Sequence, residues 1–133
     1  MSAELALQGA FVSTLKSDLG VTSGIAGRVY DRVPANAALP YVHLRSFQGV
    51  ADGADCVDGL ELYADVDVWS NAVGKPEAAR IAESVRRALD GHLLALDAPW
   101  ALIDLEHRNT IIGDEDDLLV RARISFRALV ERA

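Results

Sequence analysis

The sequence from Gly59 to Ser70, GLELYADVDVWS, decides the fold that we predict for this chain. Positions 62, 64, 66 and 68 are apolar, and the positions between them carry acidic or aromatic side chains. A period of two residues is typical of a strand that buries one face. We therefore predict a central strand over residues 59–70.

The residues after this strand change to the period of a helix. Pro76 suits the first turn of a helix, and Gly91 suits the position just past the last turn. Between them the apolar side chains fall on one helical face: Ala78, Ile81, Ala82, Val85, Ala88 and Leu89. We predict a helix over residues 76–90 that lies across the sheet.

An amphipathic helix is also predicted near the N-terminus, over residues 3–19. Ser2 is its expected N-cap and Gly20 its expected end. Its predicted apolar side consists of Leu5, Leu7, Phe11, Val12, Leu15 and Leu19.

The remaining patterns predict strands. A short extended piece is expected over 28–31 and an alternating strand over 41–47. Two further runs, 100–112 and 118–130, are joined by the acidic turn 113–117, which predicts an antiparallel hairpin. In the first of these runs strict alternation sets Leu102 and Leu105 on opposite faces, and in the second it assigns to one apolar face Leu118, Val120, Ala122, Ile124, Phe126, Ala128 and Val130.

These elements predict one α+β domain over residues 1–133. We expect a mainly antiparallel sheet of four to five strands with two helices packed on one face. Residues 48–59 are expected to form a long mobile connection into the central strand. The predicted core includes Val66, Val68, Ile81, Val85, Ile124 and Phe126.

The composition excludes several classes of protein. Thirteen basic residues against twenty acidic ones give a net charge of −7, which argues against a protein that grips nucleic-acid phosphates. The single cysteine, Cys56, excludes an internal disulfide and a cysteine-rich zinc site. No apolar run approaches the length of a membrane span, and no catalytic or phosphate-binding motif occurs. We expect no cofactor, no bound metal and no membrane contact.

Asp65 and Asp67 stand two residues apart on one face of the predicted central strand. Paired carboxylates could bind a metal ion or share a proton, but no histidine stands at ligand spacing beside them. The simpler interpretation is an ion-paired or solvated strand face. The expected partners, in the same sheet or in a neighbouring subunit, are Arg121, Arg123 and Arg127.

Several short motifs, taken in order, resemble the tail-completion or tail-terminator family of long-tailed bacteriophages and phage-like gene transfer agents. After the N-terminal amphipathic helix these motifs are RVYD at 28–31 running to Val33-Pro34, LPYV at 39–42, VWS at 68–70 with Gly74 and Glu77-Ala78, and FRA at 126–128. The motifs cover nearly the whole chain. They are structural signatures, so the resemblance brings no active site with it.

The resemblance implies a subunit of a closed ring, expected to hold six copies, that ends the tail tube at its head-proximal end. It implies as partners the tail tube protein and a neck or head-completion protein, with DNA passing through the ring without specific binding. The implied location is the tail of the virion, after assembly in the bacterial cytoplasm.

A ring of identical subunits needs complementary patches on opposite sides of each subunit. The candidate patches are the acidic row Glu61, Asp65 and Asp67 and the arginine row Arg121, Arg123 and Arg127. The acidic loops are expected at the lumen or the end faces of the ring: Asp52, Asp55, Asp58, Asp114, Glu115, Asp116 and Asp117.

Two other classes of function stay open at this point. A small cytoplasmic α+β domain could dimerise and bind a ligand between sheet and helix. An enzyme would need polar residues that converge in one cleft. The mass of the assembly separates a ring from a dimer.

Overall fold

The computed structural model describes residues 2–51 and 59–132. The elements in chain order are α1 (Ala3–Ser17), α2 (Leu19–Ile25), β1 (Val29–Tyr30), β2 (Tyr41–Ala51), β3 (Gly59–Ser70), α3 (Pro76–Leu89), β4 (Trp100–Asp114) and β5 (Val120–Arg132). The predicted α+β class is confirmed.

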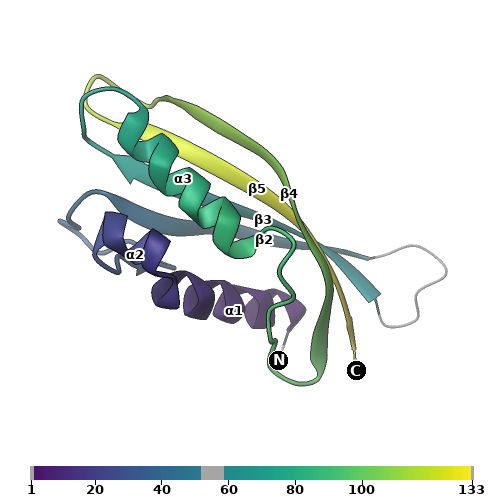
Figure 1. The fold of residues 1–133 in the computed structure, drawn as a ribbon. Coiled ribbons are helices and arrows are strands. Elements are labelled where there is room, and N and C mark those ends of the chain that lie inside the picture. Colours follow the sequence, from purple (N-terminus) through teal and green to yellow (C-terminus); the bar gives the residue numbers. More distant parts are fainter. Residues whose placement is uncertain (1, 52–58, 133) are drawn as a thin grey trace.

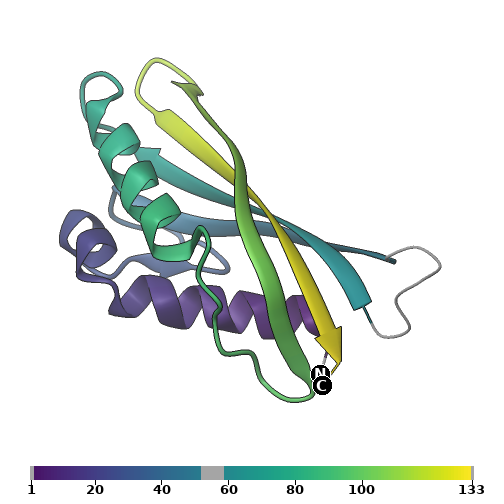
Figure 2. The ribbon, with the colours of Figure 1, turned by 45° about the vertical axis from the view of Figure 1, so that its right-hand side comes forward.

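The strands form a five-stranded sheet in the order β1-β2-β3-β5-β4. The short β1 pairs with β2 in parallel, and the other described pairs are antiparallel, including the predicted hairpin of β4 and β5. β3 occupies the middle of the sheet, as predicted. Within the described residues, the three helices lie on one face of the sheet and the other face carries no helix (Figures 1 and 2).

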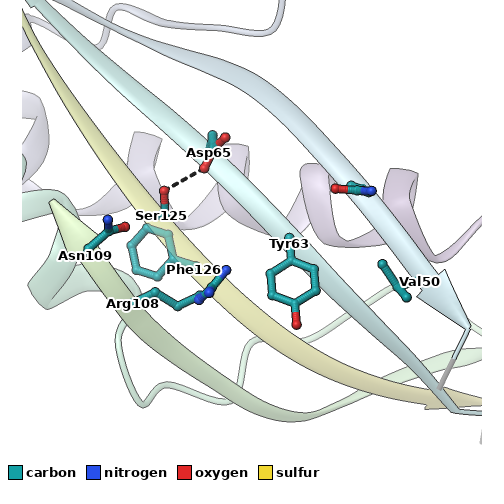
Figure 3. Close-up of a pocket in the computed structure, with 8 residues that line it drawn as sticks. Val50, Tyr63, Asp65, Arg108, Asn109, Ser125 and Phe126 are labelled. Carbon is teal, nitrogen blue, oxygen red and sulfur yellow. Dashed lines mark hydrogen bonds between the residues drawn. The ribbon is translucent and has the colours of Figure 1, made fainter. Parts of the chain in front are cut away.

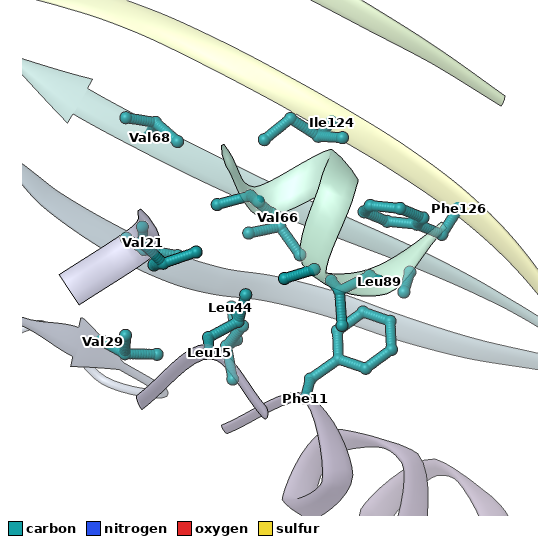
Figure 4. Packing of buried hydrophobic residues seen from close by; sticks show 14 of the residues in the cluster. Phe11, Leu15, Val21, Val29, Leu44, Val66, Val68, Leu89, Ile124 and Phe126 are labelled. Atoms are coloured by element: carbon teal, nitrogen blue, oxygen red, sulfur yellow. The ribbon is translucent and has the colours of Figure 1, made fainter. Parts of the chain in front are cut away.

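The core lies between this helical layer and the sheet. Phe11 of α1 meets Phe126 of β5 edge to face, with ring centroids 5.8 Å apart. Figure 4 shows this pair beside Leu89 of α3. The predicted core residues are confirmed, since each has at most 5% of its surface exposed: Val66, Val68, Ile81, Val85, Ile124 and Phe126.

The N-terminal helix ends earlier than predicted, and a third helix follows it. Asp18 ends α1 and also caps α2, because its Oδ1 accepts the Val21 N–H at 3.0 Å. The prediction that Gly20 ends the helix is wrong, since Gly20 lies inside α2. Leu5 and Leu19 are exposed, and alanines fill part of the buried side of α1 instead: Ala3, Ala6 and Ala10.

β2 is longer than predicted and reaches Ala51. A register shift between Leu44 and Ser46 marks a β-bulge at Arg45. The connection to β3 is correspondingly shorter than the predicted 48–59, because 48–51 belong to β2 and Gly59 to β3. The predicted loop residues Asp52, Asp55 and Asp58 lie outside the described residues.

The prediction that the apolar and polar residues of β4 alternate strictly between the two faces is wrong. Register shifts at Leu102/Asp104 and at His107/Asn109 insert extra residues, so that Leu102 and Leu105 are both buried. The predicted start of the last strand is also wrong, because Leu118 is 79% exposed in the turn before β5. The rest of the predicted apolar face of β5 is buried.

The outer edge of β4 is attached to the end of α3. The Gly91 N–H donates to the Leu105 carbonyl at 2.8 Å, and the Asp90 carboxylate accepts the His107 N–H at 2.9 Å. These bonds satisfy part of an edge that would otherwise be free to pair with other chains. In the described parts of the chain, no helix is long and apolar enough to cross a membrane.

Candidate functional site: the charged face of the sheet

The helix-free side of β3 and β5 carries the acidic and arginine rows that the sequence singled out. We call this surface the charged face; its residues are Glu61, Tyr63, Asp65, Asp67 and Trp69 of β3 and Arg121, Arg123, Ser125 and Arg127 of β5. Strand pairing sets Asp67 opposite Arg123, Asp65 opposite Ser125, Tyr63 opposite Arg127 and Trp69 opposite Arg121. Cross-strand neighbours at this spacing interact directly.

Asp67 forms the central ion pair of the charged face. Arg123 donates from Nε to Asp67 Oδ1 at 2.8 Å and from Nη2 to Oδ2 at 3.0 Å, a bidentate arrangement. Only 1% of Asp67 is exposed. The carboxylate raises the pKa of the Arg123 guanidinium, mainly through these hydrogen bonds. Arg45 of β2 approaches the same carboxylate, with its Nε 3.8 Å from Oδ2.

Glu61 accepts hydrogen bonds from both strands. The Tyr63 hydroxyl donates to Oε2 at 2.7 Å, and Arg127 Nη2 donates to Oε1 at 3.0 Å. These two hydrogen bonds, that of Tyr63 first, lower the pKa of the Glu61 carboxyl group. Arg127 also lies 3.8 Å from a carboxylate oxygen of Glu106 on β4, so its positive charge is shared between two acids.

Asp65 is held by neutral donors. Ser125 donates to its Oδ1 at 2.6 Å, and Ser46 lies 3.5 Å from Oδ2. At the start of β5, Arg121 pairs with Glu115 of the β4–β5 turn at 2.9 Å and lies over the ring of Trp69. The charged face therefore continues into that turn.

An open hollow of about 710 Å³ lies on this side of the sheet. Figure 3 shows the residues that line it. Its walls include Val50, Asn109 and the Asp65–Ser125 pair. The Arg108 guanidinium lies 4.9 Å from the centre of the Tyr63 ring, a cation–π geometry. The hollow is on the opposite side of the sheet from the helices (Figure 3), and the core side chains lie between the sheet and the helices. A smaller open hollow of about 230 Å³ lies between α3 and β4.

The structure brings all six predicted interface residues onto one face. Of the two arrangements predicted for the acids and arginines, the one found is pairing inside the subunit. Sequence reasoning did not find Arg45, Glu106 and Arg108 as members of the network. Their positions depend on bulges and on the β4–β5 register, for which no local sequence signal exists. The tip residues lie apart from the acids of β3: Asp114 is the last residue of β4, and Glu115, Asp116 and Asp117 lie in the turn that joins β4 to β5. The predicted turn 113–117 therefore begins two residues too early, because Gly113 and Asp114 still pair with β5.

The acidic side chains of the charged face form hydrogen bonds with the arginine and serine side chains of the neighbouring strand. Within residues 2–51 and 59–132, no group of three or more His, Cys, Asp or Glu side chains could hold a metal ion. Asp65 and Asp67, considered above as a paired-carboxylate site, are each engaged by donors of β5. Arginine and aromatic side chains are enriched where proteins meet, and Arg121 and Arg127 of this face are about one-third exposed, which suits contact with another protein surface.

Comparison with solved structures defines the class of the protein. A chain described as part of the virion of a native gene transfer agent particle superimposes with a TM-score of 0.87 at 30% identity, covering 98% of this chain and 99% of that one. A second solved chain, at 11% identity, has a TM-score of 0.55 over 100% of this chain and 97% of its own, and shows the fold alone. Among curated proteins no similar sequence is found.

The family follows from the sequence itself. Residues 9–131 match the family described as tail completion protein gp17. The chain belongs to this family, which confirms the resemblance seen in its motifs. It is a structural tail protein of a phage-like particle, and its place is in the virion.

Proposed function

We propose that this protein forms a closed ring, of six copies, that ends the tail tube at its head-proximal end and joins it to the neck. The observation that carries the proposal is the full-length similarity to a chain of a gene transfer agent virion, together with membership of the tail completion family. In this proposal the chain has no catalytic role and no cofactor. Its partners are its own copies, the tail tube protein and a neck or head-completion protein.

The charged face supplies one side of the contact between copies. Copies related by rotation about a ring axis meet through two different surfaces, so each subunit must offer two complementary patches. The helix-free sheet face is one extended surface available for this, and Arg121 and Arg127 remain about one-third exposed at its rim. Glu115 and Glu61, which form ion pairs with Arg121 and Arg127, fix the orientation of these two arginine side chains. The complementary patch lies on another side of the neighbour.

The charge of the chain supports a passage for DNA. A net charge of −7 repels phosphates, so DNA slides through the ring without being bound. In this arrangement two groups of acidic residues lie at the lumen or at the end faces: Asp52, Asp55 and Asp58, and the segment from Asp114 to Asp117. Fluorescently labelled duplex DNA should show no binding at about 0.1 M salt, where charges within about 10 Å still interact.

The mass of the purified protein tests the ring. Light scattering coupled to size exclusion should give six times the 14.3 kDa of one chain. A mass of one chain at every accessible protein concentration would contradict the proposal. A dimer would favour the ligand-binding alternative, which places its ligand between sheet and helix, where core side chains leave an open hollow of about 230 Å³ between α3 and β4.

A further inference from the structure

Two exposed apolar side chains come together at one end of the subunit. Val73, in the loop between β3 and α3, is 103% exposed, and Leu118, in the turn between β4 and β5, is 79% exposed. Both line a hollow of about 230 Å³. Figures 1 and 2 show the two connections at the same end of the sheet. We call this surface the acidic end; it consists of Val73, Lys75, Asp114, Asp116, Asp117 and Leu118.

The loop that carries Val73 is anchored to the core. The buried Ser70 hydroxyl donates to Glu77 at 2.7 Å and accepts the Ala72 N–H at 3.1 Å. Gly74 follows with a φ of +78°, a conformation that favours glycine. Val73 is therefore held outward by its neighbours.

The turn that carries Leu118 is also ordered by hydrogen bonds. Asp116 Oδ1 accepts the backbone N–H groups of Leu118 at 2.8 Å and of Leu119 at 2.9 Å. An ion pair of 3.5 Å between Lys75 and Asp114 links this turn to the Val73 loop. Two apolar side chains on preformed supports can be buried by a partner at a low cost in conformational entropy.

The charges around the two apolar side chains select the kind of partner. The acidic end holds the carboxylates of Asp114, Asp116 and Asp117 and the single ammonium group of Lys75. A two-fold contact between two acidic ends would set these carboxylates against each other, and like charges across an interface are unfavourable. The complementary surface is apolar at its centre and basic around it.

We propose that the acidic end is the docking surface for a different protein of the virion, one that presents an apolar side chain flanked by lysine or arginine. The proposal rests on the proposed function, because a ring at the end of a tail tube meets another protein at each of its end faces. It adds which end of the subunit makes one of these contacts and the chemistry of the partner that recognises it.

Site-specific photocrosslinking in assembled particles tests the proposal. A photoreactive amino acid replaces Val73 in one variant and Leu118 in another. Leu93, which is 70% exposed in the α3–β4 connection, provides the matched control position. The expected result is that positions 73 and 118 crosslink to the same virion protein, different from this chain, and that position 93 does not.

Three outcomes would overturn the inference: crosslinks only to another copy of this chain, no crosslink in particles that contain the variant, or the same product from position 93. The mass of the purified variants is measured in parallel. A ring that forms without the expected crosslink counts against the acidic end alone, whereas failure of the unmodified chain to form a ring counts against the proposed function.

Discussion

Asp67 of β3 and Arg123 of β5 face each other across the centre of the sheet and form a bidentate ion pair, although they lie on the face without helices. The carboxylate is almost completely buried, while 22% of the arginine side chain is exposed. The pair therefore differs from ordinary surface salt bridges, which contribute about 0 to 1 kcal/mol.

Replacement of Arg123 by alanine should destabilise the subunit strongly. It would leave the buried Asp67 carboxylate with the half-exposed Arg45, whose Nε is 3.8 Å from Oδ2, as its remaining ion-pair partner among the described residues, and removal of one partner of a buried pair costs about 3 to 5 kcal/mol. Because water can reach the exposed part of this site, we expect about 2 to 4 kcal/mol in urea unfolding. Adding Asp67→Asn should recover part of the loss, since an amide needs no counter-charge. A loss below about 1 kcal/mol would show that Asp67 is solvated.

Truncation of Phe126 to alanine tests the core. Phe126 is 1% exposed, and its aromatic side chain packs edge to face against Phe11. The cavity left by the alanine should therefore lower the free energy of unfolding by about 3 to 5 kcal/mol. Leu118→Ala in the turn before the same strand is the control, because a side chain that is 79% exposed should contribute less than about 0.5 kcal/mol. Both values come from chemical denaturation, and similar losses in the two variants would mean that the faces of β5 are misassigned.

The hydrogen bond from Tyr63 to Glu61 should be visible in a titration. The pKa of Glu61 is lowered, first by Tyr63 and then by Arg127, so Tyr63→Phe should move this pKa back toward the usual value of a glutamate. A group with a lowered pKa stabilises the folded state above its unfolded pKa of about 4.3, and this contribution is lost as pH falls through the folded pKa. Carboxyl carbon shifts of Glu61 measured by NMR in both proteins provide the check; equal pKa values would contradict the assigned hydrogen bond.

Much of this fold is readable from periodicity, and the exceptions have physical causes. The alternation of β3 and the helical period of α3 each specify which side is buried, because a single face of each element packs on the core. α2 escaped prediction because the apolar period of α1 continued through Leu19, although Asp18 has the side chain of an N-cap. The bulges of β4 leave no local trace, since they arise from how this strand pairs with β5.

The sequence predicted which residues lie on the charged face, but it did not predict which of them pair with each other. Period two places Asp65 and Asp67 on one side of β3, and Arg121 and Arg123 on one side of β5. Which acid meets which arginine depends on the register between strands that are far apart in sequence, and that register is set by the tertiary fold. The burial of Asp67 follows from the same long-range arrangement. Because Arg123 holds the buried Asp67 carboxylate, its replacement would destabilise the subunit, so Arg123 is unsuitable for a test of assembly.

The ring interface is best tested by charge reversal that spares Arg123. Arg121 and Arg127 pair with acids of their own subunit at partly exposed positions, so reversing both should cost the monomer little. If the charged face meets a neighbour, Arg121→Glu with Arg127→Glu should weaken the ring by like-charge repulsion and unpaired polar groups. Light scattering should then give a lower mass at a protein concentration where the wild type assembles, with an unchanged circular dichroism spectrum.

The matched control reverses the same amount of charge on the helical side. Arg80 and Arg87 are exposed and lie seven residues apart on one side of α3, so Arg80→Glu with Arg87→Glu changes the net charge equally. A loss of mass in the first variant alone shows a specific contact through the charged face, whereas a loss in both variants means either a general effect of added negative charge or a complementary patch on α3. A full ring mass for the Arg121 and Arg127 variant would place the interface elsewhere, and loss of its secondary structure would mean that these arginines stabilise the subunit itself.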